Sequence, residues 1–461
     1  MRSLLFIMKF SLKILSVSVA MSLGAISSFA VSLEFVGSSR PVLDLSANKT
    51  TGLDKFYVVY DMSQISEMRL TGVSASGLEV SRYGNLGGGF AENVEYTYAD
   101  GVAVVSNPTG DMGYIINDNG SRYYVWVIDY SQHMLELTSA TEADNQQCGS
   151  TTLVVEGRGE PIYYYTIDGR RKELDRQIYV YYKNLEWSAE SESYLQIDAV
   201  EEFSHLQNFS VTPPLYCNST FDITGDRFLR EWGIEKQITS SLVYANGVEV
   251  NTSAAQTNAP DDSADADASN MIKNDNEGMG GSAPADFSFR AWVTDAVVHS
   301  EWQIAADADF EYIDQRFNEQ NLDYTFTEEG TYYVRFVGSN DDGSCESYGE
   351  TYTIGIGSSE LRIPNAFTPN DDGINDVWKV AYRSLLSFSC TIFDRYGTQL
   401  YHFTDPSQGW DGKYKGKLVK PGVYFYVIEA KGADGRTYKK GGDINIIKSK
   451  RYNGVATPPA Q

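Results

Sequence analysis

The chain is short of the residues that enzymes most often use for catalysis. It has 461 residues but only four histidines, which stand far apart and outside any metal-binding spacing: His133, His205, His299 and His402. It also lacks the Gly-x-Ser-x-Gly elbow of hydrolases and the phosphate-binding P-loop. A pair of catalytic carboxylates depends on spacing in space, so 62 acidic residues neither indicate nor exclude a glycoside hydrolase. We therefore predict that the protein is not an enzyme and needs no cofactor.

Basic residues are scarce as well. The chain has 37 lysines and arginines against 62 aspartates and glutamates, and its formal net charge is −25. A nucleic-acid-binding protein needs a basic face that neutralises phosphates. The composition therefore predicts no nucleic-acid partner.

Cysteine is limited to four residues, and the sequence contains no Cys-x-x-Cys pair or Cys/His cluster that would indicate zinc. In an exported protein, all four are candidates for disulfide bonds: Cys148, Cys217, Cys345 and Cys390. Four cysteines allow three pairings, and the sequence does not choose among them.

The N-terminus has the features of a secretory signal peptide. Lys9 and Lys13 supply positive charge, and the segment Ile14–Ala25 is mostly apolar but short for a membrane span. Ser28-Phe29-Ala30 provides the small residues that precede a cleavage site. We expect residues 1–30 to be removed on export, and a membrane anchor is the alternative. No later apolar run reaches the 18 residues of a transmembrane helix.

Tyrosine, in contrast, is abundant, with 32 residues, and it favours pleated, half-buried surfaces. Lys55–Tyr60 and Tyr123–Ile128 have the composition of strands. Asn119-Gly120 lies between strand-like runs and tolerates positive φ, which predicts a hairpin. The fold class is therefore predicted to be all-β, with a first β-rich domain at residues 31–143.

A short internal repeat follows. Cys148–Thr151 and Cys217–Thr220 each place a cysteine before a strand-like run, about 70 residues apart. This spacing favours tandem immunoglobulin-like β-sandwich domains over a solenoid, although a chance match of two strand starts is the alternative. We place an immunoglobulin-like domain at residues 144–212 and a second β-rich domain at residues 213–285.

The second of these domains is expected to end in an acidic flexible loop within residues 251–285. Its aspartates could ligate calcium, but they lack EF-hand spacing, so a solvated loop is the favoured interpretation: Asp261, Asp262, Asp265 and Asp267. Asp262-Ser263-Ala264 is similar to a short acceptor motif for O-glycosylation in exported Bacteroidetes proteins. Ser263 is therefore a candidate glycosylation site.

Residues 286–357 predict a compact β domain. Phe287–Val293 alternates along the chain, Glu301–Ile304 contains a central Trp, and Thr331–Val337 follows a Gly turn. These features resemble a polycystic-kidney-disease-type module. The resemblance implies an immunoglobulin-like spacer or interaction domain.

The last fifth of the chain contains four motifs in a characteristic order. They are Ile363–Asp376, Phe393–Gly397, Trp410–Lys417 and Pro421–Val427. Together they closely resemble the gliding-motility-associated C-terminal domain, the type B sorting domain that Bacteroidetes use with the type IX secretion system. The resemblance implies a sorting sandwich at 358–451 and a flexible tail at 452–461. It assigns the motif to Pro364, Asn365, Phe367, Thr368, Pro369, Asn370, Asp372, Gly373, Asn375, Asp376, Arg395, Gly397, Trp410, Asp411, Gly412, Gly422 and Tyr424.

Within this domain, the segment 370–376 is the best metal candidate. Oxygen ligands from Asn370, Asp372 and Asp376 would suit calcium. The alternative, which we prefer, is a tight turn in which these side chains bond their own backbone and Gly373 takes positive φ.

Three further features of this domain lead to predictions. Trp410 is expected to pack its loop against the sandwich, which is compatible with a contact surface for the secretion machinery. Gly422–Lys431 is apolar on both faces, which predicts a central strand covered on both sides. Basic residues within Lys439–Arg451 form either a recognition patch or a protective edge.

The resemblance implies a route for the protein. The signal peptide would direct export to the periplasm, and the type IX machinery would carry the chain across the outer membrane. A PorP/SprF-like outer-membrane barrel is the expected partner and would hold the protein at the surface. We predict a structural or adhesive protein at the outer-membrane surface or outside the cell, with surface glycans and other surface proteins as further candidate partners.

Two alternatives remain. In one, the chain is a glycan-binding adhesin or a hydrolase with its active region in residues 31–250. In the other, it is an accessory component of the secretion or gliding apparatus. Calcium is the one candidate cofactor.

Overall fold

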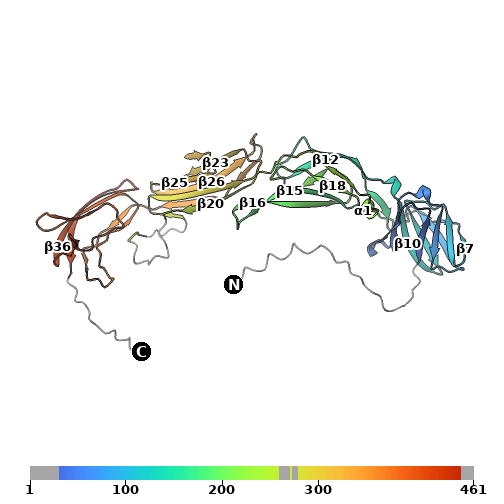
Figure 1. Ribbon diagram of the computed structural model, residues 1–461, viewed down its shortest axis with the longest axis horizontal. Coiled ribbons are helices and arrows are strands. Elements are labelled where there is room, and N and C mark those ends of the chain that lie inside the picture. Colours follow the sequence, from blue (N-terminus) through green and yellow to red (C-terminus); the bar gives the residue numbers. More distant parts are fainter. Residues whose placement is uncertain (1–30, 259–269, 273–278, 448–461) are drawn as a thin grey trace, which may run out of the picture. The chain divides into compact units, whose positions relative to one another are not determined.

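The computed structural model describes residues 31–258, 270–272 and 279–447 (Figure 1). Several predicted features lie outside these residues: the signal peptide at 1–30, the aspartates from Asp261 to Asp267, Ser263 and the tail at 452–461. In the described part of the chain, no helix is long and apolar enough to cross a membrane. Strands dominate this part throughout, which confirms the all-β fold class.

The chain divides into two compact units, which are described separately. Unit 1 consists of the described residues up to Leu135 together with Arg158–Arg176 and Gly225–Glu235. Unit 2 consists of Glu136–Gly157, Gln177–Thr224 and the described residues from Lys236 onward.

The body of unit 1 is a sandwich of two sheets. The first sheet has the order β1-β4-β8-β7, with antiparallel neighbours: β1 (Ser32–Val36), β4 (Glu67–Thr71), β8 (Val102–Ser106) and β7 (Thr97–Ala99). The second has the order β2-β3-β10-β9-β5-β6: β2 (Leu43–Ser46), β3 (Lys55–Val59), β10 (Ser121–Asp129), β9 (Met112–Asp118), β5 (Leu78–Tyr83) and β6 (Glu92–Asn93). Inward-facing side chains of both sheets share one core, which includes Met68, Leu70, Val80, Ile116 and Val127.

Local turn chemistry shapes the connections of this sandwich. Asn119 (φ 50°) and Gly120 (φ 92°) turn β9 into β10, which confirms the predicted hairpin. Three 3-10 helices are each capped by the side chain of the preceding Asn or Asp: η1 (Lys49–Thr51), η2 (Met62–Gln64) and η3 (Tyr130–Gln132).

A hairpin and a short helix from later in the chain complete unit 1. The hairpin is formed by β13 (Ile162–Tyr165) and β14 (Arg171–Leu174), and the helix is α1 (Arg227–Glu231). Tyr164 packs edge-on against Phe56 of the sandwich, with ring centroids 4.7 Å apart. These apolar contacts explain why the chain returns to unit 1 after leaving it.

A buried ion pair also holds these segments to the sandwich. Arg176 and Asp226 have fully buried side chains, and their Nη2 and Oδ2 atoms lie 2.8 Å apart. Arg176 donates further hydrogen bonds to the carbonyls of His133 (2.6 Å) and Glu160 (2.9 Å), and Asp226 accepts one from the Tyr130 hydroxyl at 3.1 Å. Because these partners are far apart in the sequence, the pair joins separate segments at one point.

Unit 2 begins with two sheets. One has the order β11-β12-β17: β11 (Glu136–Glu142), β12 (Thr151–Arg158) and β17 (Phe209–Val211). The other has the order β16-β15-β18-β19: β16 (Ser193–Phe203), β15 (Ile178–Ser188), β18 (Asp222–Gly225) and β19 (Lys236–Thr239). β11 lies beside β19, so the two sheets meet along one side.

The next part of unit 2 is a sandwich around Trp302, which is fully buried. Its first sheet has the order β20-β22-β25: β20 (Val250–Gln256), β22 (Ala285–Val293) and β25 (Asn321–Phe326). Its second has the order β21-β28-β26-β23-β24, with β27 also paired to β26: β21 (Met279–Gly281), β28 (Tyr352–Ile356), β26 (Gly330–Ser339), β23 (His299–Ala305), β24 (Gln315–Phe317) and β27 (Glu346–Tyr348).

The expectation of a loop through residues 251–285 was wrong at both of its ends. Residues up to Gln256 form β20, which pairs with β22 over seven residues, and β21 pairs in parallel with β28. The small polar side chains of β20 predict poor burial, but a strand at the edge of a sheet needs only one neighbour for its backbone.

The last part of unit 2 contains a five-stranded sheet with the order β30-β37-β36-β32-β33. Its strands are β30 (Ala366–Phe367), β37 (Thr437–Ile446), β36 (Gly422–Gly432), β32 (Leu385–Phe393) and β33 (Gln399–Phe403). Two short pairs accompany it: β29 (Glu360–Arg362) with β31 (Ala381–Arg383), and β34 (Lys413–Tyr414) with β35 (Lys417–Leu418). Its core includes Trp378, Phe388, Trp410, Ile428 and Ile444.

Breaking the buried ion pair should destabilise unit 1. Asp226→Ala leaves the Arg176 guanidinium buried without its counter-charge, so we expect the free energy of unfolding to fall by about 3–5 kcal/mol. Urea unfolding followed by hydrogen exchange of amides in residues 31–135 measures this loss. The control is Glu67→Ala, which removes an exposed partner of Arg69 and should cost under about 1 kcal/mol. Equal losses of unfolding free energy in the two variants would show that the buried pair of Arg176 and Asp226 does not stabilise unit 1.

Candidate functional site

The first C-terminal motif closes one edge of the five-stranded sheet, where β30 pairs in parallel with β37. The carbonyl of Asn365 accepts the backbone N–H of Asn445 at 2.8 Å. The carbonyl of Pro364 accepts the indole N–H of Trp378 at 2.7 Å. Phe367 is only 3% exposed. These motif residues therefore act in the framework of the domain.

The loop that follows is folded around one carboxylate. Asp376 accepts backbone N–H groups from Asn370, Asp371 and Gly373, each at 2.7 Å. Gly373 has φ 86°, as the predicted turn requires. The polar residues of this motif thus bond their own backbone.

Three neighbouring hydrogen bonds reinforce this loop. The side-chain amide of Asn370 donates to Asp372 at 2.7 Å, and Asp372 accepts the N–H of Ile374 at 2.9 Å. Thr368 donates its N–H to the carbonyl of Asn375 at 2.9 Å, which joins the two ends of the loop.

The same hydrogen bonds set the charge state of Asp376. Partial desolvation acts to raise its pKa, but the N–H donors of Gly373, Asn370 and Asp371 outweigh that effect and lower the pKa below its usual value. Among the described residues, no three or more His, Cys, Asp or Glu side chains gather as a set of metal ligands. Calcium binding at this loop stays a prediction.

Two tryptophans hold the motif loops against the sheet. Trp378 and Trp410 are fully buried and exchange two backbone hydrogen bonds, of 2.9 and 3.0 Å. Trp410 packs against Phe367 and Tyr424, with ring centroids 5.6 and 5.3 Å away, and donates its indole N–H to the carbonyl of Lys413. Packing was the role predicted for Trp410. The sequence alone does not reveal the role of Trp378, because a single Trp between Val377 and Lys379 belongs to no motif.

Gly412 allows a close approach beside these tryptophans. It has φ 74°, and a Cβ added there would lie 3.1 Å from Pro369. Asp411 accepts the N–H of Lys413 at 3.0 Å and so forms the turn on the other side. The Asp-Gly pair is therefore a structural turn.

The motif around Arg395 forms the tip of the β32–β33 hairpin. Asp394 accepts the N–H groups of Tyr396 and Thr398, both at 2.8 Å, and Gly397 has φ 83°. The guanidinium of Arg395 lies over the ring of Tyr396, which is exposed. This tip presents a cation and an aromatic ring to solvent.

The central strand β36 is covered on one side only. Tyr424 and Ile428 point to the core, whereas Val423, Phe425 and Val427 are 49%, 43% and 50% exposed. The prediction of a strand covered on both sides was therefore wrong. The sheet meets its core with one face, and the described part of the chain provides no second layer over the other.

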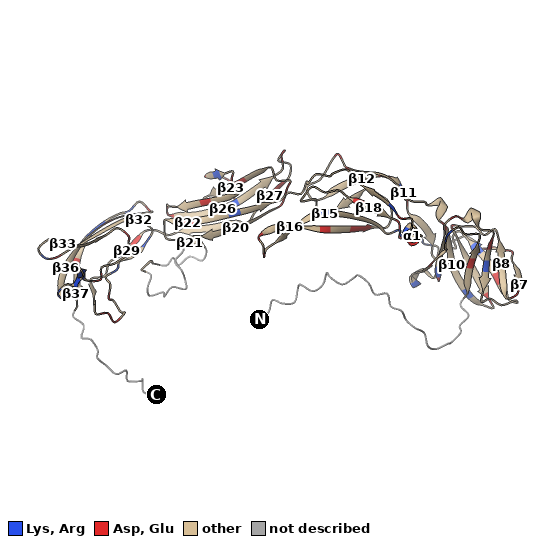
Figure 2. Cartoon of the chain, viewed as in Figure 1, with Lys and Arg blue, Asp and Glu red and all other residues tan. Residues whose placement is uncertain are grey.

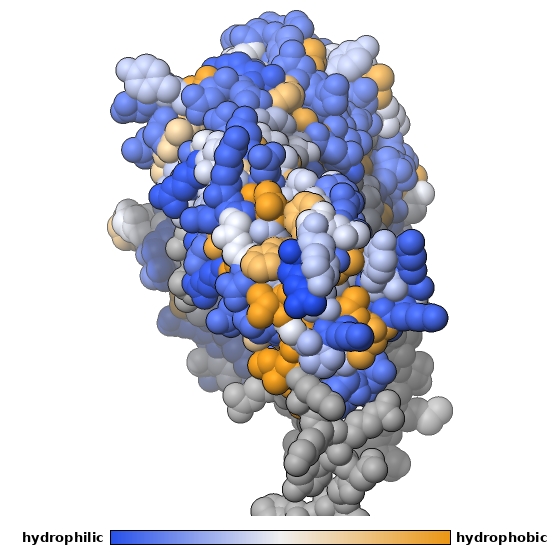
Figure 3. Space-filling model, turned by 90° about the vertical axis from the view of Figure 1, so that its left-hand side faces the viewer, coloured by the Kyte–Doolittle hydropathy of each residue, from blue (hydrophilic) through white to orange (hydrophobic). Residues whose placement is uncertain are grey.

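The uncovered side forms an apolar surface, which we call the β36 face. It consists of Val423, Phe425 and Val427 with their cross-strand neighbours Phe393 and Thr391 on β32. Figure 3 turns this end of the molecule toward the viewer and shows apolar side chains gathered among polar ones. In a half-exposed antiparallel sheet the outer residues are usually polar. A contiguous apolar patch therefore indicates an interaction surface.

The charge of this region differs from that of the whole chain. Residues 361–446 contain 12 lysines and arginines and 9 aspartates and glutamates, whereas the chain carries −25. Lys413, Lys415, Lys417 and Lys420 stand close together on and beside the β34–β35 pair. Blue and red residues are mixed over this domain in Figure 2.

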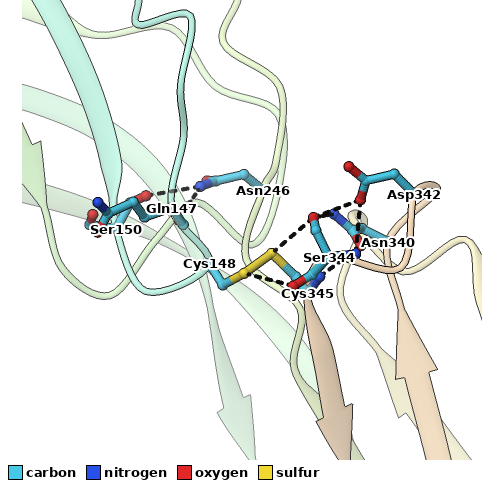
Figure 4. Close-up of a disulfide and its surroundings, with 8 residues drawn as sticks. All are labelled: Gln147, Cys148, Ser150, Asn246, Asn340, Asp342, Ser344 and Cys345. Carbon is cyan, nitrogen blue, oxygen red and sulfur yellow. Dashed lines mark hydrogen bonds between the residues drawn. A yellow bond between two sulfur atoms is a disulfide. The ribbon is translucent and has the colours of Figure 1, made fainter.

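Of the four candidate cysteines, two form a disulfide. Cys148 is joined to Cys345 across 197 residues, next to Ser344 and Asn340 at a hairpin tip (Figure 4). The candidate roles of Cys217 and Cys390 in disulfides were wrong, because both are buried free thiols. Cys217 lies between β17 and β18 with its thiol near the carbonyl of Lys183, and Cys390 lies on β32 within the core of the signal domain.

Comparison with known proteins gives two family matches. Residues 139–240 match a fibronectin type III domain, Fn3_FA, and residues 361–446 match the CHU_C Type IX secretion signal domain. No curated protein matches the chain.

Two solved structures are similar at low sequence identity. The tetra-tandem repeat from the extending region of a large adhesion protein is 12% identical, with 84% of this chain and 97% of that chain covered and a TM-score of 0.21. Dimeric latent PorU from Porphyromonas gingivalis is 10% identical, with 71% of this chain and 35% of that chain covered and a TM-score of 0.15. At these TM-scores neither structure supports an inference about this chain.

The architecture is that of an all-β protein built from tandem immunoglobulin-like sandwiches. Its residues 361–446 are a type IX secretion signal domain, and an immunoglobulin-like domain of the fibronectin type III class precedes it. This confirms the resemblance recognised in the sequence. A type IX secretion signal implies export out of the cell by the type IX machinery.

The fibronectin match also corrects the interpretation of the internal repeat. The segments after Cys148 and Cys217 lead into β12 and β18, which both lie within residues 139–240. The repeat therefore reflects two strands of one sandwich and not two tandem domains.

Removing the Asp376 carboxylate should loosen the loop that it organises. In Asp376→Ala we expect faster amide exchange at residues 370–376 and a lower melting temperature of the signal domain. Because the folded pKa of Asp376 is lowered, its contribution is present above about pH 4 and is lost as the pH falls further. The two proteins should therefore converge in acid. Calcium that stabilised the wild type but not the variant would instead identify a metal site.

The buried thiols should be unreactive in the native protein. Burial raises the pKa of Cys390 to about 12 and also raises that of Cys217, so little thiolate forms. We expect a thiol reagent to label no cysteine in the folded chain and two per chain after unfolding without reductant. Cys148→Ser should gain one reactive thiol, at Cys345. Labelling of four cysteines in the unfolded wild type would contradict the disulfide.

Proposed function

We propose that this protein is a non-catalytic structural or adhesive factor. The type IX machinery exports it, and a PorP/SprF-like outer-membrane barrel holds it at the cell surface through the β36 face. The observation that carries this proposal is an uncovered apolar strand on the domain that bears the secretion signal. Motif residues such as Asp376 and Trp410 form turns or pack in the core, whereas the β36 face is uncovered and available for a partner.

The energetics of the β36 face favour a protein partner. Val423, Phe425 and Val427 lie on alternate positions of one strand, so a single flat surface can cover all three. Covering the exposed half of each of these three side chains would contribute about 1 kcal/mol per side chain to the free energy of binding. Polar and charged neighbours, including Glu429 and Asp443 on the same side, would set the orientation of the partner.

The preceding domains support a spacer or contact role. Their aromatic residues are largely committed to cores, as Trp302 and Phe289 illustrate with ring centroids 5.3 Å apart. This use of aromatic side chains in packing supports a structural or adhesive role.

Protease treatment of intact cells tests the proposal. Wild-type protein should be accessible to an added protease, and a chain that lacks residues 358–461 should remain inside. A triple variant, Val423→Ser, Phe425→Ser and Val427→Ser, should be depleted from the surface. Accumulation in the periplasm would mark a loss of recognition, and release to the medium would mark a loss of attachment.

The matched control replaces three exposed apolar residues outside the signal domain: Phe90→Ser, Tyr312→Ser and Val298→Ser. It should reach the surface in wild-type amounts. A triple β36 variant that is displayed like the wild type would refute the role of the β36 face, and surface display of the truncated chain would refute the export route.

A further inference from the structure

The strand β16 is an unusually open edge of the fibronectin type III sandwich. It is eleven residues long and stands at the end of the order β16-β15-β18-β19. It pairs with β15 in one continuous register from Ser193 to Phe203, and no strand of the described chain lies on its other side. Proteins usually protect such edges with proline, a bulge or charged side chains, above all lysine. β16 has no proline, no lysine and no register shift against β15, and the charges that it carries are all acidic.

Apolar side chains line this edge. Leu195, Ile197 and Val200 are 48%, 37% and 54% exposed. Ile197 lies opposite Asn184, which is buried, so Leu195 and Ile197 stand on the core side of the sheet, where the sandwich ends before covering them. An additional strand would continue the sheet over this place and cover both side chains.

The other side of β16 is acidic. Asp198, Val200 and Glu202 alternate with the core-side residues. The Asp198 Oδ1 atom lies 3.1 Å from the Lys183 Nζ atom, and both side chains are exposed. Acidic residues colour part of this strand red in Figure 2. With Glu201, β16 carries three acids and no base. A second copy of the strand would bring like charges together, whereas a basic strand would be attracted.

We propose that the β16 edge binds an extended segment of another protein by adding it to the sheet as a new strand. The alternation of β16 defines the segment. Its apolar residues lie beside Leu195 and Ile197, and its Lys or Arg residues lie beside Asp198 and Glu202. Main-chain hydrogen bonds supply affinity, and this alternate apolar and basic pattern supplies specificity. The site is separate from the signal domain and from its role in export.

A pair of synthetic peptides tests this mode of binding. Both are about ten residues long and alternate Val with Lys, and one carries N-methyl groups along the backbone edge that would face β16. The mature full chain should bind the unmodified peptide and protect amides of residues 193–203 from hydrogen exchange. The methylated peptide has the same charge and side chains but cannot complete the ladder, so its binding should be at least about tenfold weaker.

Charge-reversed variants test the specificity. Asp198→Lys combined with Glu202→Lys should weaken binding of the unmodified peptide by about tenfold or more. The control, Glu311→Lys with Glu319→Lys, makes the same change in net charge at exposed loop positions and should bind like the wild type. Asp198→Asn, which keeps the size of the side chain, should have an intermediate effect.

Three results would overturn the proposal. One is equal binding of the two peptides, which would indicate charge attraction alone. Another is equal weakening in the β16 and control variants. The third is a dimer in sedimentation experiments that the β16 variants abolish, because the occupant of the edge would then be a second copy of this chain.

Discussion

The buried pair of Arg176 and Asp226 is the constraint on which unit 1 depends. A charge in a protein interior is tolerated only when its partner and hydrogen bonds replace the lost water. Here the guanidinium also bonds two carbonyls, and burial together with Asp226 raises the pKa of Tyr130, so that its hydroxyl stays a donor. The partners come from four stretches of the chain, around Tyr130 and His133, at Glu160, at Arg176 and at Asp226, so satisfying one ion pair positions all four.

The signal domain must also hold separate segments together, and it does so with buried aromatic rings and with a carboxylate that bonds the backbone. Its loops are held by Trp378 and Trp410 and by the Asp376 carboxylate, which bonds the backbone of its own turn. The residues that identify the domain in the sequence are therefore mainly structural. The β36 face remains uncovered, and its Val423, Phe425 and Val427 lie within the motif segment Pro421–Val427.

The two exposed surfaces differ in the kind of contact that they offer. The β36 face presents side chains of a central strand whose backbone is already paired on both sides. The β16 edge presents an unpaired backbone as well as side chains. A partner can therefore cover the first as one surface against another, whereas it must become part of the sheet at the second. Export and later contacts can thus use different parts of one chain without competing.

The sequence by itself determined the features that depend on short stretches of chain. Alternation and turn residues predicted the all-β class and the hairpin at Asn119-Gly120, and the ordered C-terminal motifs predicted the signal domain. Only the tertiary structure decided that Cys148 pairs with Cys345, that Arg176 meets Asp226, and that one side of β36 stays uncovered. The physical reason is that pairing and burial depend on which distant segments become neighbours, whereas local conformation depends on adjacent residues.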